Sequence, residues 1–117
     1  MLIDSHCHLD RLKLDAYSGD LGAAIAAAHE RGIQQMLCIG ISLENIQTVI
    51  DIAQAHPRVV ASVGVHPCDV KEDFREQLAV MEDWLEKRQF AAIGEIGTDL
   101  YWDKSTFGIQ KEALEIQ

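Results

Sequence analysis

A closely spaced pair of histidines near the start of the chain has the chemistry to bind a divalent metal ion. His6 and His8 follow a short apolar segment, Leu2-Ile3, with one residue between them. In an extended backbone their side chains project from the same face, about 6.6 Å apart along the chain, whereas Cys7 points the other way. Two imidazoles so arranged can converge on one ion. Because this spacing is only moderately specific, two histidines held by ordinary hydrogen bonds are the alternative.

Two more candidate ligands follow apolar segments later in the chain. His66 comes directly after residues 59–65, and Glu95 follows residues 90–94 and precedes Gly97. Packing explains a carboxylate at that position poorly, and neighbouring glycines let other groups approach the backbone closely. The alternatives are a purely structural His-Pro turn at His66 and a solvated loop carboxylate at Glu95. Together with the first histidine pair, these residues predict a metal site with nitrogen and oxygen ligands.

The segments that must position these residues alternate between apolar stretches of strand length and helical patterns. Apolar residues recur at i, i+3, i+4 and i+7 in the helical segments, whereas the strand segments are nearly continuous apolar runs. We predict strands at 2–3, 35–41, 59–65 and 90–94, and helices at 21–28, 46–53, 74–85 and 110–117. Gly32 is predicted to cap the first helix at its C-terminus, and Ser42 to cap the second at its N-terminus.

Strands that alternate with helices in this way indicate right-handed βαβ units and a parallel sheet. The periodicity does not decide between an open doubly wound sheet and half of a TIM barrel. In both architectures functional groups gather at the C-terminal ends of the strands. The four candidate ligands follow three different strands at that end, so we expect them to converge.

The length of the chain bounds these possibilities. It has 117 residues, whereas a complete eight-stranded α/β barrel takes roughly 250. Residues 112–117 form a helical stretch without a Gly, Asn or Pro to terminate it, so we expect a chain that has been cut short.

The composition describes an acidic protein of ordinary globular character. The chain has 10 Lys and Arg against 19 Asp and Glu, which gives a formal net charge of −9. This charge argues against a simple DNA-binding module but leaves open a metalloenzyme in which cations bridge protein and phosphate. Three cysteines without CxxC spacing indicate reduced thiols. With no visible signal peptide or apolar membrane span, we expect a cytoplasmic protein.

Three motifs together resemble the TatD family of metal-dependent deoxyribonucleases, which belongs to the amidohydrolase-like TIM barrels. They are IDSHCHLD at 3–10, VGVHP at 63–67, and IGEIG at 93–97 followed by Asp99. The resemblance covers the whole chain but corresponds only to the N-terminal portion of a family member. It implies that residues 1–117 form a partial TatD-type metallohydrolase domain. The implied fold is the N-terminal half of a TIM (β/α)8 barrel, with about four parallel strands alternating with helices.

The resemblance also implies roles for individual residues. His6 and His8 match the family's first pair of metal ligands, and Glu95 matches the carboxylate that bridges two metal ions. His66 matches a histidine at the mouth of the active site that contacts substrate phosphate or the catalytic water. Asp99 matches an acidic residue beside the site, so Glu95, His66 and Asp99 are the expected catalytic residues.

The implied reaction is hydrolysis of the phosphodiester bonds of DNA by water activated between two divalent metal ions, whether magnesium, zinc or manganese. The family completes its metal sites with two later histidines and an aspartate that this chain does not contain. We therefore expect these residues alone to be weakly active or inactive. Thr98 and Leu100 depart from the family's usual Leu-Asp-Tyr sequence, which alters the local fit around Glu95.

Two other interpretations stay open. Another metallohydrolase of the same superfamily, acting on a C–N bond or a small phosphate ester, would have the same pair of histidines. The second interpretation is a non-catalytic half-barrel whose role is to oligomerise. The open sheet edges and the uncovered apolar face of a half-barrel favour such self-association.

Overall fold

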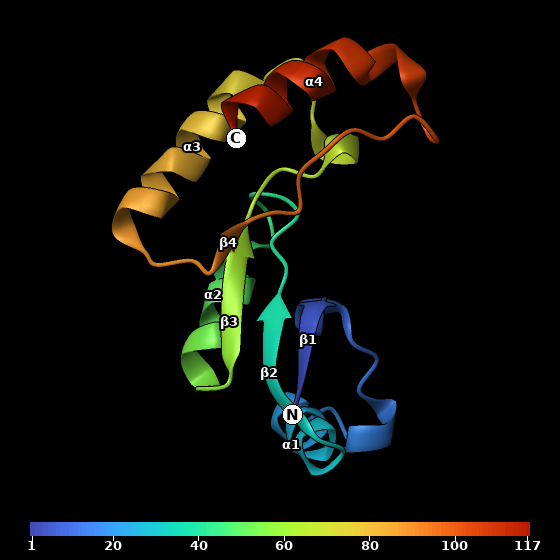
Figure 1. Cartoon of the computed structure of the whole chain (residues 1–117), viewed down its shortest axis with the longest axis vertical. Coiled ribbons are helices and arrows are strands. Elements are labelled where there is room, and N and C mark those ends of the chain that lie inside the picture. Colours follow the sequence, from blue (N-terminus) through green and yellow to red (C-terminus); the bar gives the residue numbers. More distant parts are fainter.

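The computed structural model describes residues 1–117 and contains one parallel four-stranded sheet in the order β1-β2-β3-β4 (Figure 1). The strands are β1 (Leu2–Cys7), β2 (Ile33–Cys38), β3 (Val59–Val63) and β4 (Ala92–Ile93). They alternate with helices α1 (Leu21–Glu30), α2 (Ile46–Ala55), α3 (Phe74–Lys87) and α4 (Phe107–Ile116). The predicted parallel sheet of four strands is confirmed.

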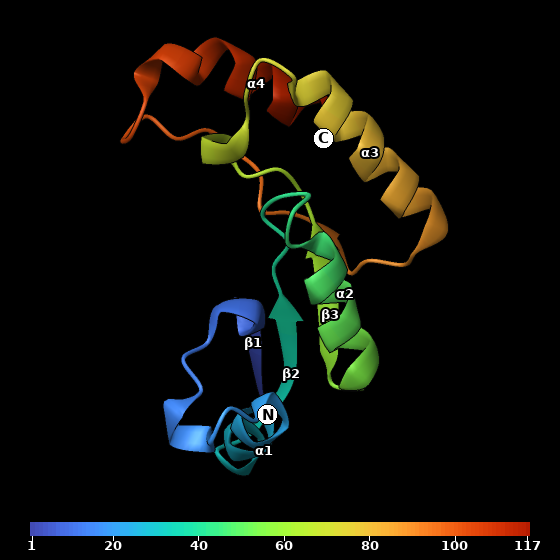
Figure 2. The same ribbon diagram turned by 180° about the vertical axis from the view of Figure 1, so that it is seen from behind.

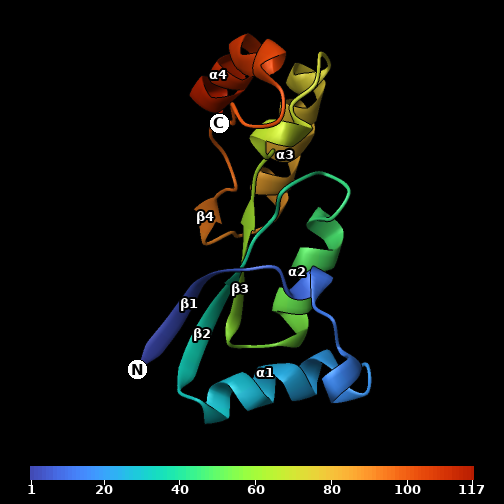
Figure 3. The ribbon, with the colours of Figure 1, turned by 90° about the vertical axis from the view of Figure 1, so that its right-hand side faces the viewer.

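The strand order distinguishes the two predicted architectures. In a doubly wound sheet the order reverses at a switch point, whereas the strands of a TIM barrel follow one another around the sheet. Here each strand pairs with the next one along the chain, and α1 and α2 lie on the same side of the sheet (Figure 3). This is the arrangement of half a barrel. None of the helices is long and apolar enough to cross a membrane.

Two apolar clusters hold the helices in place. The first lies between the sheet and the helices α1 and α2, and it includes Ile25, Met36, Val49 and Val59. The second joins α2 and the end of β3 to α3 and α4, which lie beyond the sheet (Figure 2); its members are Ile46, Ile50, Val63, Val65, Val70, Phe74, Leu78, Met81 and Ala113. Since α2 contributes to both clusters, it connects the two parts of the molecule.

Several predicted element boundaries differ from the observed ones. The prediction of Ser42 as an N-cap is wrong, because α2 begins at Ile46 with Asn45 before it. Asn45 Oδ1 instead accepts hydrogen bonds from the backbone N–H groups of Ile41 and Ser42, which delays the helix by one turn. Gly32 has a φ of +98° and directly follows the C-cap residue of α1, as expected for a helix stop.

The lengths of the strands and of the last helix also differ. β1 continues to Cys7, so His6 lies within a strand, whereas β4 has only two residues. Short 3-10 turns follow β1 and β3 and precede α4 at Lys104–Thr106, so α4 begins at Phe107 rather than 110.

At the C-terminal end of the sheet, neighbouring backbone segments approach two glycines so closely that a side chain would not fit at either position. A Cβ atom on Gly64 would lie 2.7 Å from the carbonyl carbon of Gly94 and 3.0 Å from the backbone nitrogen of Glu95. A Cβ on Gly40 would lie 2.6 Å from the carbonyl oxygen of Ser62. The backbones after β2, β3 and β4 can therefore meet only because these positions are glycine.

Replacing Gly64 by Ala should destabilise the protein by about 1–3 kcal/mol, the usual cost of overpacking a rigid backbone contact. The matched control is Gly108→Ala in α4, where an added Cβ meets nothing within 4 Å. Since Ala is favoured over Gly in a helix by about 1 kcal/mol, that change should stabilise the protein. Urea denaturation measures both free energies of unfolding. Equal effects of the two substitutions would contradict the close approach at Gly64.

Candidate functional site

Three of the predicted ligands converge at the C-terminal end of the sheet. His6 lies in β1, His8 directly follows β1, and Glu95 follows β4. One potential ligand atom from each of the three lies within 4.8 Å of the others. The imidazole rings of His6 and His8 are 5.1 Å apart between centroids, with an interplanar angle of 77°. Glu95, which is 87 or more positions away from the two histidines in the chain, thus forms one cluster with their imidazoles.

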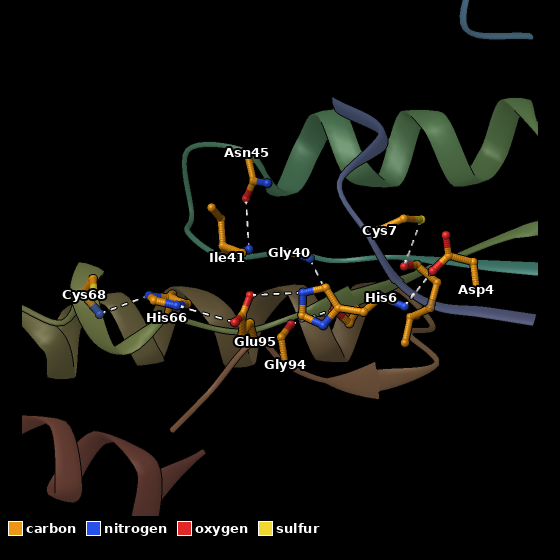
Figure 4. A network of polar contacts seen from close by, with 12 residues as sticks. Asp4, His6, Cys7, Gly40, Ile41, Asn45, His66, Cys68, Gly94 and Glu95 are labelled. Atoms are coloured by element: carbon orange, nitrogen blue, oxygen red, sulfur yellow. Dashed lines mark hydrogen bonds and ion pairs between the residues drawn. The ribbon is translucent and has the colours of Figure 1, made fainter. Parts of the chain in front are cut away.

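The carboxylate of Glu95 lies between two histidines (Figure 4). Its Oε2 atom is 3.5 Å from Nε2 of His6, and its Oε1 atom is 3.5 Å from Nε2 of His66. Each oxygen of Glu95 therefore faces a different imidazole. His66 lies outside the three-residue cluster but contacts it through Glu95.

A hydrogen bond orients the His66 ring. The backbone N–H of Cys68 donates to Nδ1 of His66 over 3.1 Å, which places the lone pair of that nitrogen in a hydrogen bond. The proton of the neutral ring therefore resides on Nε2, which points toward Glu95. In this tautomer His66 offers an N–H donor to an anion in the site.

The fully buried hydroxyl of Ser62 determines the position of the backbone that carries Glu95. Its Oγ donates to the carbonyl oxygen of Gly94 over 2.7 Å and accepts from the backbone N–H of Gly40 over 3.2 Å. The backbone N–H of Glu95 in turn donates to the carbonyl oxygen of Gly40 over 2.8 Å. Ser62 was not among the predicted site residues, although its lone hydroxyl within the apolar run 59–65 was a signal for it.

A second polar contact orders the loop after β1. Asn45 Nδ2 donates to Oδ2 of Asp10 over 3.1 Å, and this links the loop that follows His8 to the loop between β2 and α2. Arg11 Nε lies 3.7 Å from the same carboxylate oxygen. Asn45 was also missed, because nothing local in the sequence marks it as a contact of residue 10.

Asp99 lies outside the histidine–carboxylate cluster. Its Oδ1 accepts hydrogen bonds from the backbone N–H groups of Tyr101 and Trp102, over 2.7 and 3.3 Å. The bond from Tyr101 is the main reason that the pKa of Asp99 is lower than usual. Its own backbone N–H donates to Oε1 of the buried Gln110 over 2.7 Å. The observed contacts of Asp99 therefore shape the loop after β4.

The cluster opens into a polar cleft of about 340 Å³. Its lining residues come from the segments that follow all four strands: His8, Arg11, Ile41, His66, Cys68, Asp69, Glu95 and Trp102. A more apolar pocket of about 430 Å³ lies between α2, the start of β3 and residues 88–91, and no candidate ligand lines it. Three of the candidate residues, His8, His66 and Glu95, thus line one cleft.

The donor set of the cluster suits a divalent metal ion such as zinc, which binds imidazole nitrogens and carboxylate oxygens. Nδ1 of His8 is buried and has no hydrogen-bond partner in the protein. A buried nitrogen without a partner is costly unless something occupies its lone pair. The residues present therefore fit a metal ion.

Comparison with known proteins relates the chain to a family. The family model described as TatD related DNase matches residues 3–117. The chain is 31% identical over 117 residues to the uncharacterized metal-dependent hydrolase YabD of Bacillus subtilis, covering 100% of this chain and 45% of that protein. It is 32% identical over 102 residues to the 3'-5' ssDNA/RNA exonuclease TatD of Edwardsiella piscicida, covering 86% of this chain and 39% of that protein.

A solved structure gives the same result for the fold. The crystal structure of YjjV, a TatD homologue from Escherichia coli, superimposes with a TM-score of 0.84 at 30% identity, over 97% of this chain and 43% of that one. The chain therefore spans less than half the length of the relatives it matches. Its four strands and helices correspond to part of their TIM barrel.

The three cysteines differ in their environments. Desolvation and the nearby Asp4 raise the pKa of the Cys7 thiol to about 12, and Cys38 is fully buried with a raised pKa. Cys68 is exposed at the cleft, and its pKa is raised by desolvation and then by the negative charge of Asp99.

Cys68 should be the first thiol that iodoacetamide alkylates at neutral pH, because it is the exposed one. Asp99→Asn should accelerate this alkylation, since loss of the negative charge lowers the Cys68 pKa and increases the thiolate fraction. Mass spectrometry of the labelled peptides measures the rate, with Asp51→Asn on α2 as the control. An unchanged rate in Asp99→Asn would contradict the contact between Asp99 and Cys68.

Proposed function

The chain belongs to the family of TatD-related DNases, and from that premise we propose that it hydrolyses phosphodiester bonds of DNA with a divalent metal ion held by His6, His8 and Glu95. The observation that carries the proposal is the convergence of these three side chains, with ligand atoms within 4.8 Å of one another. The unpartnered Nδ1 of His8 supports it independently. The relatives named metal-dependent hydrolases and TatD exonuclease support metal use and a nucleic-acid substrate.

We further propose that Glu95 bridges two metal ions in the whole site. Its two carboxylate oxygens face different histidines, which suits a bridging ligand. Within residues 1–117, His6, His8 and Glu95 would hold one ion, whereas Glu95 alone would be available to a second. The proposed assignment of these residues is a partial TatD-type domain, the first four βα units of the barrel, with weak activity by themselves.

The proposed chemistry divides between the ion and the protein. A bound divalent ion supplies Lewis acidity, which activates water and stabilises negative charge on the phosphoryl group. His66 donates the proton on Nε2 in a hydrogen bond to a phosphate oxygen that enters beside Glu95, and Cys68 keeps its ring in that orientation. Glu95 sets the position of the reacting group relative to His6 and His66. Asp99 supports the loop at the edge of the site.

Charge is the main physical obstacle to this function. The chain carries a net charge of −9, and phosphate esters are anionic, so association is unfavourable without cations. A metal ion in the cluster offsets this charge locally. Arg11, on the cleft wall, adds a guanidinium suited to phosphate.

Isothermal titration with Zn²⁺ tests the ligand assignment. We expect one ion per chain and at least about 10-fold weaker binding in His6→Ala, His8→Ala and Glu95→Gln, because even indirect supports of a ligand contribute that much. His56→Ala, at the end of α2 outside the cluster, is the matched control. The metal-loaded chain should slowly hydrolyse bis-p-nitrophenyl phosphate, and EDTA or Glu95→Gln should reduce this to background.

Three outcomes would overturn parts of the proposal. Hydrolysis of small amides without hydrolysis of phosphodiesters would instead favour an enzyme acting on C–N bonds. Zinc affinity that is unchanged in His8→Ala would exclude the assigned metal site. Rapid cleavage of DNA by residues 1–117 alone would contradict the expected weak activity.

We also propose that the open edges of the sheet let two copies associate. On edge strand β1, Leu2 is 59% and Ile3 56% exposed, and Ile93 on edge strand β4 is 43% exposed. β1 of one copy could pair with β4 of another, which would cover these residues and remove both unpaired edges. This would make the half-barrel an oligomerising unit, whether or not it is catalytic.

Sedimentation equilibrium tests this association. We expect a dimer that dissociates at least about 10-fold more readily in Ile3→Lys and Ile93→Lys, because each charge would lie between paired edges. The matched control, Val80→Lys, changes a similarly exposed residue on α3. A monomer at all concentrations, or a dimer that survives both edge substitutions, would refute pairing through β1 and β4.

A further inference from the structure

An exposed pair of aromatic residues stands in the segment between β4 and α4. Tyr101 is 82% and Trp102 77% exposed. Their rings meet edge to face, with centroids 4.9 Å apart and an interplanar angle of 87°. The segment forms an open bend at the outer edge of the molecule (Figure 2). Neither the metal ligands nor the apolar clusters account for these two side chains.

Hydrogen bonds hold the backbone of this pair in place. The Asp99 carboxylate accepts from the backbone N–H groups of both Tyr101 and Trp102. The backbone of Asp99 is fixed in turn by Gln110, which is only 2% exposed and whose Nε2 donates to Oγ1 of Thr106 over 2.9 Å. Because the backbone that carries these two rings is already fixed, less conformational entropy is lost when they bind a ligand. The loop is therefore preorganised for binding.

The location of Trp102 indicates what kind of ligand the two rings bind. Trp102 lines the same cleft as His66 and Glu95, and Arg11 is the only Lys or Arg among the lining residues. A ligand whose phosphate reaches Glu95 and whose planar group reaches Trp102 would contact both the polar and the aromatic residues of the cleft. A nucleotide has those two parts.

We propose that Tyr101 and Trp102 form a stacking platform for an unpaired base of single-stranded nucleic acid, with Arg11 contacting a neighbouring phosphate. This inference rests on the proposed phosphodiesterase function and adds a binding element to it. Stacking needs an exposed π-face, which a base within a duplex does not offer, so the platform selects single strands.

The net charge gives an independent reason for such a platform. A chain of charge −9 gains little from counterion release, because few basic residues can neutralise phosphates. Base–aromatic stacking does not depend on net charge, and it contributes about 1–3 kcal/mol per base. The apolar rings therefore provide affinity that the electrostatics of this protein cannot.

Fluorescence of Trp102 tests the proposal directly. The other tryptophan, Trp84, is replaced by Phe, and the 117-residue chain is titrated in EDTA with oligodeoxythymidylate, so that no cleavage occurs. We expect saturable quenching by the single strand and none by a duplex or by an abasic strand of equal length. For the variants the affinity is measured by the fluorescence anisotropy of a fluorescein-labelled strand, because Trp102→Leu and Trp102→Phe remove the tryptophan signal. The affinity should fall by about 10-fold in Trp102→Leu and Tyr101→Leu, and Trp102→Phe should retain most of it.

The matched control is Leu100→Ala, which changes an exposed residue of the same loop. Far-ultraviolet circular dichroism and the thermal midpoint show whether each variant is folded. The logarithm of affinity should fall with the logarithm of salt concentration with a slope of only about −0.7, as expected for one phosphate contact. Absence of quenching, equal binding of the abasic strand, or unchanged affinity in Trp102→Leu would overturn the platform.

The failure of this inference can be distinguished from failure of the proposed function. If the metal-loaded chain hydrolyses bis-p-nitrophenyl phosphate but Trp102 is not quenched, the phosphodiesterase proposal stands and the platform is refuted. If Trp102 is quenched as expected but no phosphodiester is hydrolysed, the platform stands as a binding site and the catalytic proposal fails.

Discussion

The close approach of three backbone segments at the C-terminal end of the sheet is the constraint on which the candidate site depends. Gly40 and Gly64 leave no room for a Cβ there, and the buried hydroxyl of Ser62 bonds to the segments after both β2 and β4. Because β4 has only two residues, regular pairing alone would hold Glu95 weakly. The glycines and the hydroxyl together bring Glu95 within reach of a histidine from β1.

Local pattern was sufficient to predict four parallel strands, but not the residues at which they end. The predicted convergence of His6, His8 and Glu95 at one edge of the sheet is observed, and the metal chemistry assigned to them stays a proposal. The apolar spacing predicted the start of α2 at Ile46, but the predicted N-cap at Ser42 was wrong, because Asn45 accepts hydrogen bonds from the backbone N–H groups of Ile41 and Ser42. Such contacts depend on the folded path of the chain.

The polar residues that hold the site in place could not be predicted from the sequence for the same physical reason. Ser62, Asn45 and Gln110 each bond to a residue at least 11 positions away. Ser62 and Gln110 are buried and Asn45 is half-buried, and only the position of a lone hydroxyl within an apolar run marked Ser62 in the sequence. A buried polar group without a partner is costly, so each of these side chains fixes the geometry of the segment that satisfies it.

Asp99 connects the proposed chemistry to the proposed recognition of the base. Its sequence position beside Glu95 suggested an acid that acts in the reaction, whereas its observed bonds are to the loop that carries Tyr101 and Trp102. The same carboxylate also raises the pKa of Cys68, whose backbone N–H orients His66. One carboxylate thus contacts both the aromatic loop and the turn that holds the His66 ring. A change in its charge would therefore disturb both the aromatic loop and the turn beside His66, even if Asp99 never touches the reacting phosphate.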